Sequence, residues 1–326
     1  MEHLCLLEYV SECDSDLYKI IEGIKKSCIS IQELIVTSSI QNLHGNHETG
    51  INDNHLNFSG DIQKKLDVIS NEIMINHLIE SESCCLLLSE ENEDVILVEK
   101  EKRGKYMVTF DPLDGSSNID CNVCIGTIFS IYESVNKDIY DEVDYLRNGN
   151  EMICAGYCLY GPSTEMVITI GMNHGVHQFT LHPYLKDFVY VKQIQFPEKH
   201  KKIYSVNESS FENWSSSIQN YVLSYKIKNT PYTQRYVGSM VADVHRTLLY
   251  GGMFMYPADE KNKKGKLRYY YECAPISKIV EEAGGKSIVP NENPIRILDL
   301  EIGNIHEKTP ILLGTSSEVD KYMEYV

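Results

Sequence analysis

The sequence predicts a layered sandwich of the α/β (α+β) class, built from two α/β subdomains. Its 326 residues are 42% hydrophobic and 24% charged, which supplies enough apolar side chains for two packed halves. Helical patterns and strand-like runs occur in both halves, and no segment is repeated. A proline-containing stretch around residues 195–202 separates an N-terminal subdomain, expected over 1–196, from a C-terminal subdomain over 197–326.

Two amphipathic helices are expected near the N-terminus. Asp14 can cap the first, whose apolar residues recur at spacings of three and four from residue 17 to 35 and whose end is expected near residue 44. The second is expected over 61–78, after an Asn-, His- and Gly-rich stretch that predicts a loop. Asp67 lies off the apolar stripe of this second helix, so by its position alone it is expected at the surface.

Short apolar runs then predict most of the remaining elements. The expected strands are 84–89, 95–98, 106–110, 125–132, 153–160, 165–170, 178–181, 188–191, 203–206, 253–256, 267–271 and 311–314. Helices are expected over 240–250 and 275–283, the second ended by two glycines, and a short helix closes the chain.

The stretch FDPLDGSSN, residues 110–118, is a candidate for a site that binds a metal ion and a phosphate. Pro112 is expected to end strand pairing and stiffen a turn that brings Asp111 and Asp114 to one side. Gly115 and the Ser and Asn residues after it can offer backbone N–H groups to an anion. Carboxylate oxygens beside such a pocket suit a phosphate held by Mg²⁺ or Mn²⁺, whereas DPxD alone could be an ordinary Asp-rich turn.

Metal-assisted hydrolysis of a phosphate ester requires several carboxylates that converge from separate segments. The candidates stand at predicted strand ends and helix starts: Asp67, Glu90, Glu91, Asp111, Asp114 and Glu272.

The overall charge restricts the partners. A net charge of −17 and a pI of about 5.1 argue against nucleic-acid binding through phosphate contacts. No apolar run reaches the length of a membrane span, and the first residues do not resemble a signal peptide, so a cytoplasmic protein is expected. The ten scattered cysteines predict free thiols, and Cys121 and Cys124 are expected to be buried structural thiols.

DPLDGSS resembles the signature of the metal-dependent, lithium-sensitive sugar phosphatases, and FDPLDGSSNIDC resembles the fructose-1,6-bisphosphatase family in particular. The similarity extends over nearly the whole chain and includes the strings GDIQKKLDVISNE, LLLSEE, VEKEKRGKY, GTIFSIY, AGYCLYG, RYVGSMVADVHRT, KLR and YECAP. It implies the sugar phosphatase fold and two or three Mg²⁺ ions per subunit, with Mn²⁺ or Zn²⁺ as alternatives.

The resemblance also assigns roles to residues. The implied metal ligands are Glu90, Glu91, Asp111, the carbonyl of Leu113, Asp114 and Glu272. Catalytic roles are implied for Asp67, Glu91 and Asp114, with Asp67 and Glu91 positioning or deprotonating the attacking water. The phosphate that is removed would be held by Gly115, Ser116 and Ser117.

A second group of residues would bind the rest of the substrate. The implied ligands of the far phosphate are Asn207, Arg235, Tyr236 and Tyr256, and those of the sugar are Met240 and Lys266. In the family the arginine comes from a neighbouring subunit, which implies a homotetramer. At Ser210 the family commonly has a tyrosine, which leaves one bond to the far phosphate in question.

The chain also departs from the family at its AMP site. Lys105 and Tyr106 match that site, but the expected Gly-Thr-Gly-Glu turn is replaced by a segment that contains Asp14, Ser15 and Asp16, and Glu133 stands where a basic residue is expected. Because acidic side chains repel a nucleotide phosphate, weak or absent AMP inhibition is expected.

The sequence therefore predicts an Mg²⁺-dependent phosphatase that removes the 1-phosphate of fructose 1,6-bisphosphate in gluconeogenesis. The alternatives are a sedoheptulose-1,7-bisphosphatase, or an enzyme of dual specificity, and a catalytically silent regulatory or interaction protein. The complete set of carboxylates argues against the silent protein.

Overall fold

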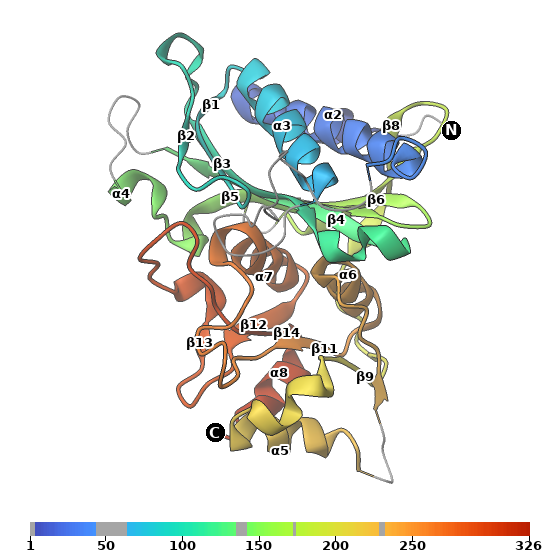
Figure 1. Cartoon of the computed structure of the whole chain (residues 1–326), viewed down its shortest axis with the longest axis vertical. Coiled ribbons are helices and arrows are strands. Elements are labelled where there is room, and N and C mark those ends of the chain that lie inside the picture. The colour runs from blue at the N-terminus through green and yellow to red at the C-terminus, as the bar shows by residue number, and fades with distance from the viewer. Residues whose placement is uncertain (1–3, 44–63, 135–141, 172–173, 228–231) are drawn as a thin grey trace.

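The computed structural model describes residues 4–43, 64–134, 142–171, 174–227 and 232–326. Figure 1 shows five layers: helices, a sheet, helices, a second sheet and helices again. The layered α/β class is therefore confirmed. The first sheet comes from residues 84–194 and the second from residues 203–315. The polar stretch at 195–202 therefore connects the two sheets along the chain.

The outer layer over the first sheet consists of α2 (Ser15–Thr37) and α3 (Lys65–Glu80), with the short α1 (Leu6–Tyr9) beside them. Asp14 caps α2 as expected, because its carboxylate accepts from the N–H of Asp16. The expected end near residue 44 is wrong, since α2 ends at Thr37 and turns follow. The predicted loop after residue 43 and the predicted start of the second helix lie outside the described residues.

The first sheet has eight strands in the order β2-β1-β3-β4-β5-β6-β7-β8. β1 and β3 are parallel, and every other neighbouring pair is antiparallel. The strands are β1 (Cys84–Ser89), β2 (Ile96–Leu97), β3 (Tyr106–Asp114), β4 (Ile125–Glu133), β5 (Met152–Tyr160), β6 (Thr164–Ile170), β7 (Val176–His182) and β8 (Asp187–Ile194).

The expectation that Pro112 ends strand pairing is wrong. β3 continues to Asp114 and pairs with β4 on both sides of the proline, at Asp111 and again at Asp114. The register shifts between these two pairs, so the residue that lacks an N–H lies in a bulge where no ladder bond is required of it.

The second sheet has six strands in the order β10-β9-β11-β14-β12-β13. They are β9 (Ile203–Ser205), β10 (Thr233–Gln234), β11 (Met253–Tyr256), β12 (Gly285–Val289), β13 (Ile295–Arg296) and β14 (Ile311–Thr315). The strand expected over 267–271 is wrong, because Tyr269–Cys273 forms a π-helical turn, η5, that leads into α7 (Ala274–Glu282). All three tyrosines of this turn are buried, and a short run buried on every side has no periodicity that separates strand from helix.

Helices α6 (Met240–Tyr250) and α7 form the middle layer, while α5 (Ser216–Ser224) and α8 (Ser316–Tyr322) lie on the other face of the second sheet (Figure 1). A single hydrophobic cluster joins Ile128 of the first sheet, Val244 of α6, Ile279 of α7 and Phe254 of the second sheet. The two halves therefore share a core, and their division into subdomains at residue 196 stays a prediction.

Shorter elements connect these layers. They are α4 (Glu142–Tyr145) and the 3₁₀ turns η1 (Lys100–Lys102), η2 (Ser116–Cys121), η3 (Gly149–Glu151), η4 (Glu208–Asn213) and η6 (Ile297–Asp299).

The cysteines and the helix lengths bear on two expectations. None of the ten cysteines, which all lie in the described ranges, forms a disulfide, as predicted. Cys121 is exposed and Cys124 is half-buried, so the prediction that both are buried is wrong. Within the described ranges, no helix combines the length and apolar character needed to cross a membrane.

Candidate active site

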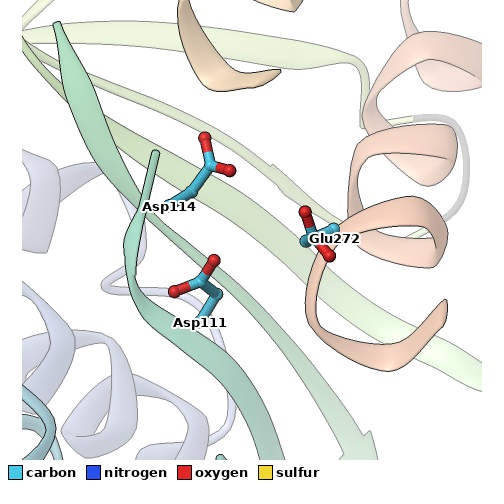
Figure 2. Close-up of side chains that lie close together, drawn as sticks. All are labelled: Asp111, Asp114 and Glu272. Carbon is cyan, nitrogen blue, oxygen red and sulfur yellow. The ribbon is translucent and has the colours of Figure 1, made fainter. Parts of the chain in front are cut away.

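Three buried carboxylates meet where the first sheet faces the middle layer. Asp111 and Asp114 come from the end of β3, and Glu272 comes from η5 (Figure 2). One carboxylate oxygen of each lies within 4.8 Å of the others. Their residues are only 4%, 6% and 5% exposed, so water screens their mutual repulsion poorly.

Backbone geometry holds these side chains in place. The N–H of Leu113 donates to Asp111 at 2.9 Å, which tightens the bulge around Pro112. The N–H of Val241, at the start of α6, donates to Asp114 at 3.0 Å. Glu272 accepts from the N–H of Arg268 at 2.6 Å, so the π-helical turn closes around its own carboxylate. Backbone donors from three elements thus orient the three groups.

The environment strongly disfavours three negative charges here. Burial raises the pKa of Asp111 well above its usual value, and the charges of Glu90 and Asp114 add to the effect. Burial also raises the pKa of Asp114 to about 7, although the Val241 N–H opposes the shift. Burial, Glu90 and Asp114 raise the pKa of Glu272 in the same way. Buried carboxylates that repel one another when ionised are suited to binding a divalent cation, so these three residues form a candidate metal-binding group.

Glu90 and Glu91 follow β1 next to this group, since the N–H of Glu90 donates to the carbonyl of Phe110 at 3.1 Å. The carboxylate of Glu90 pairs with the buried guanidinium of Arg268. Among the described residues, the group within 4.8 Å contains neither Glu90 nor Glu91. Arg268 was not singled out from the sequence, although it ends the matching string KLR.

The expectation from helix pattern that Asp67 lies at the surface is wrong, because Asp67 is only 2% exposed. It is the third residue of α3, and its carboxylate accepts from the N–H of Lys64 at 2.7 Å. Burial raises its pKa to about 7, and hydrogen bonds from Lys64 and Ser116 limit the shift. The structure therefore brings Asp67 next to the predicted phosphate turn.

That turn is the start of η2. Gly115 has φ +78°, and a Cβ built on it would lie 3.1 Å from the side chain of Ser239, so this position requires glycine for its conformation and leaves little room. Asn118 donates from its side-chain amide to the carbonyl of Gly238 at 2.9 Å. The residues 115–118 are thus joined to the C-terminal half in front of α6.

The predicted substrate residues divide into two groups. Tyr236, Met240 and Tyr256 line one cavity of about 70 Å³ together with Asp114. Asn207, Arg235 and Lys266 are exposed and do not line this cavity. Asn207 instead caps η4, where its side chain accepts from the N–H of Ser209.

Asp243 lines the same cavity and was also missed by sequence reasoning. It has no exposed surface and accepts hydrogen bonds from the N–H groups of Val237 and Gly238. An acidic residue in the first turn of the expected helix 240–250 was visible in the sequence, but such residues commonly serve only the helix end.

The residues of the expected AMP region also lie together near the start of α2, where Tyr106 is buried and the others are exposed or half-buried. Lys105 lies 3.4 Å from the carboxylate of Asp14 and 3.7 Å from that of Glu133. The hydroxyl of Tyr106 donates to Asp14 at 3.3 Å. α2 starts with Ser15 and Asp16 at this point. The cationic group of this region is therefore surrounded by the protein's own carboxylates.

Comparisons with known proteins agree with this architecture. A family model described as fructose-1-6-bisphosphatase, N-terminal domain, matches residues 6–193, and the corresponding C-terminal domain model matches residues 197–326. Fructose-1,6-bisphosphatase 1 of Bos taurus is 48% identical over 271 residues, which cover 82% of this chain and 79% of the relative. The cytosolic fructose-1,6-bisphosphatase of Arabidopsis thaliana is 49% identical over 269 residues, which cover 81% of this chain and 77% of the relative.

A solved structure agrees over the full length. The crystal structure of Leishmania major fructose-1,6-bisphosphatase in holo form matches with a TM-score of 0.92 at 40% identity, covering 100% of this chain and 99% of that one.

Proposed function

This chain belongs to the fructose-1,6-bisphosphatase family and is a phosphoric monoester hydrolase of that family, and we propose that it hydrolyses the 1-phosphate of fructose 1,6-bisphosphate. The products are fructose 6-phosphate and phosphate, as in gluconeogenesis, and the proposed location is the cytoplasm. The observation that carries this proposal is the meeting of Asp111, Asp114 and Glu272 within 4.8 Å, directly before the phosphate turn at Gly115.

The donor set supports magnesium dependence. The proposed ligands are the carboxylates of Glu90, Glu91, Asp111, Asp114 and Glu272 and the carbonyl of Leu113. Two or three Mg²⁺ ions, or Mn²⁺ or Zn²⁺, would neutralise charge on the phosphate and acidify a water molecule. Arg268 has a matching role, because it compensates the charge of Glu90 while the ligand carboxylates are close together.

Asp67 is the proposed proton acceptor for the attacking water, with Glu91 as its partner. A pKa of about 7 places the carboxyl of Asp67 where it can accept a proton and release it again near neutral pH. Its contact with Ser116 supports the role, since it places Asp67 beside the group proposed to hold the reacting phosphate, Gly115, Ser116 and Ser117.

The rest of the substrate is assigned to the C-terminal half. Tyr236, Tyr256 and Asn207 are the proposed ligands of the far phosphate, and Met240 and Lys266 contact the sugar. The cavity that Asp114 shares with Tyr236 and Tyr256 supports a substrate that spans both groups. Arg235 is exposed and completes the far-phosphate site of a neighbouring subunit, which makes the proposed assembly a homotetramer.

Inhibition by AMP is proposed to be weak or absent. Lys105, which would attract a nucleotide phosphate, already lies between Asp14 and Glu133. A phosphate entering there would meet two carboxylates and would have to displace them from the ammonium group.

The test is phosphate release from the purified protein. Fructose 1,6-bisphosphate, sedoheptulose 1,7-bisphosphate and inositol monophosphate are compared with Mg²⁺ and with EDTA. We expect turnover that requires metal and is fastest with the fructose substrate. Preference for the seven-carbon sugar would overturn the assigned substrate and direct attention to Ser210. No turnover of any substrate would support a catalytically silent relative.

A further inference from the structure

The segment that carries two of the proposed far-phosphate ligands has little packing of its own. In the stretch 235–238, Arg235, Val237 and Gly238 are exposed, and only Tyr236 is partly buried. Gly238 also has φ +86°. Tyr236 is the residue of this segment that packs against the hydrophobic core, so the conformation of the rest depends on the hydrogen bonds that hold its main chain.

One side chain accepts three of these bonds. The carboxylate of Asp243 accepts from the N–H of Val237 through both oxygens, at 3.1 and 3.0 Å, and from the N–H of Gly238 at 3.0 Å. The hydroxyl of Ser205 donates to the same carboxylate at 2.8 Å. Asp243 is fully buried. Because hydrogen bonds to charged groups are among the strongest, its carboxylate anchors the segment to α6 and to β9.

Arg246 connects Asp243 to a further residue of the segment, Arg235. Its guanidinium contacts the carboxylate of Asp243 at 2.5 Å and donates to the carbonyl of Arg235 at 2.7 Å. The N–H of Arg235 donates to the carbonyl of Tyr204 in β9 at 2.9 Å. The ion pair of Asp243 and Arg246 therefore binds the main chain on both sides of Tyr236, at Arg235 and at Val237 and Gly238.

We propose that Asp243 is a positioning residue that sets the affinity for the phosphate that does not react. A carboxylate would repel that phosphate if it touched it, and the oxygens of Asp243 already accept from the segment, so its effect passes through Tyr236 and Arg235. This inference rests on the proposed function. It adds a residue whose loss weakens substrate binding through a group that contacts no substrate.

The test compares two substrates in the variant Asp243→Asn. The amide keeps the size of the carboxylate, but its NH₂ group faces N–H donors and cannot accept from them. We measure kcat and KM with Mg²⁺ for fructose 1,6-bisphosphate and for fructose 1-phosphate, which lacks the far phosphate. We expect kcat/KM for the bisphosphate to fall about 10- to 100-fold, chiefly through KM. The fall for fructose 1-phosphate should be at least about 5-fold smaller.

If Asp243 had a purely structural role, its substitution would lower kcat/KM equally for both substrates. An equal fall in kcat/KM, or no fall, therefore overturns the proposal. Failure of the proposed function would be visible separately, because the wild-type protein would then not hydrolyse fructose 1,6-bisphosphate. The matched control is Glu165→Gln, a buried carboxylate in β6 that is bonded to Ser163, Gln178 and Thr180 and should leave the ratio unchanged.

A second variant keeps the test decisive if Asp243→Asn does not fold. Arg246→Gln leaves the bonds from Val237 and Gly238 to Asp243 and removes the ion pair and the bond to the carbonyl of Arg235. It should shift the ratio of the two substrates in the same direction by a smaller factor, and an unchanged ratio in this variant would also overturn the proposal.

Discussion

The protein gathers carboxylates in two places, one buried and one at the surface. The buried group, Asp111, Asp114 and Glu272, lies between β3 and η5 and is at most 6% exposed. In the surface group, the side chains of Asp14 and Glu133 are 46% and 59% exposed and lie around Lys105. The residue types are nearly the same in the two groups. The groups differ in their exposure to water and in whether a lysine lies among the carboxylates.

These surroundings shift the pKa of Asp14 in the opposite direction from the pKa values of the buried group. Burial raises the pKa of all three carboxyls in the buried group. Desolvation by itself also raises the pKa of Asp14, but the N–H of Asp16 and the Lys105 ammonium outweigh it and lower that pKa. Hydrogen bonding to Tyr106, together with Asp14, raises the pKa of Lys105. In the surface group the charge of Lys105 compensates the carboxylates. The buried group is suited to a cation bound from solution.

The largest expected effect separates the two groups by catalysis. Asp114→Asn keeps the shape of a buried ligand but removes its charge, so we expect kcat to fall by about 10²- to 10³-fold or more at saturating Mg²⁺. The metal-free variant should be at least as stable as the metal-free wild type, because one repelling charge is gone. Phosphate release and the Tm in EDTA measure the two effects.

Glu133→Gln makes the same chemical change in the surface group and serves as the control. It should change kcat by less than about 2-fold, since exposed pairs contribute little. Near-normal turnover of Asp114→Asn would remove that residue from the proposed metal site.

The next effect concerns metal removal and pH. A carboxyl whose pKa is raised by folding stabilises the folded protein below its unfolded pKa, about 4, and this contribution is lost as pH rises through the folded pKa. For Asp114 this window ends at about 7. The metal-free protein should therefore lose stability as the pH rises from about 4 to about 7, and Mg²⁺ should raise the Tm more at pH 8 than at pH 6.

The measurement is a Tm series in EDTA and in Mg²⁺ from about pH 4 to pH 8. We expect the increase on adding Mg²⁺ to exceed about 5 °C at pH 8 when Mg²⁺ is far above its Kd. An increase that is equal at both pH values, or larger at pH 6, would contradict the assignment of the buried group as the cation site.

A smaller effect tests the surface group as a site that repels nucleotides. AMP should inhibit the wild-type enzyme weakly, and Glu133→Arg should increase that inhibition because it replaces a repelling charge with an attracting one. The measurement is an AMP titration of both proteins at fixed substrate. Strong inhibition of the wild type at micromolar AMP would show that Asp14 and Glu133 do not block the region.

The smallest effect concerns the N-cap of α2. Asp14→Ala removes the acceptor for the N–H of Asp16 and one partner of Lys105. The Tm should fall by about 2 °C or less, without loss of activity. A thermal melt at pH 7 measures it, and a rise in Tm would mean that Asp14 is unfavourable where it stands.

Much of the architecture could be predicted from local patterns. The helix over 240–250 and the strands over 84–89 and 253–256 have the predicted bounds, because each has a clear period or a clear boundary residue. The motif around Asp111 and Asp114 indicated a phosphate held by a metal ion, since few ligands require carboxylates beside an N–H-lined turn, and its resemblance to a known signature indicated the family.

The sequence could not predict which residues are desolvated together. Asp67 appeared exposed by helix pattern but is buried, and Glu90 lies on Arg268 instead of within the group of three. Asp243 was not singled out from the sequence, yet it holds the segment that carries Arg235 and Tyr236.

The sequence by itself therefore determined the family, many of the helices and strands, and the carboxylates that could take part. The tertiary structure decided that β3 passes through Pro112 in a bulge, that residues 269–273 form a π-helical turn, and that Glu272 meets Asp111. The physical reason is that propensity and periodicity act between neighbours in the chain. Burial and charge repulsion depend on segments that only the folded chain brings together.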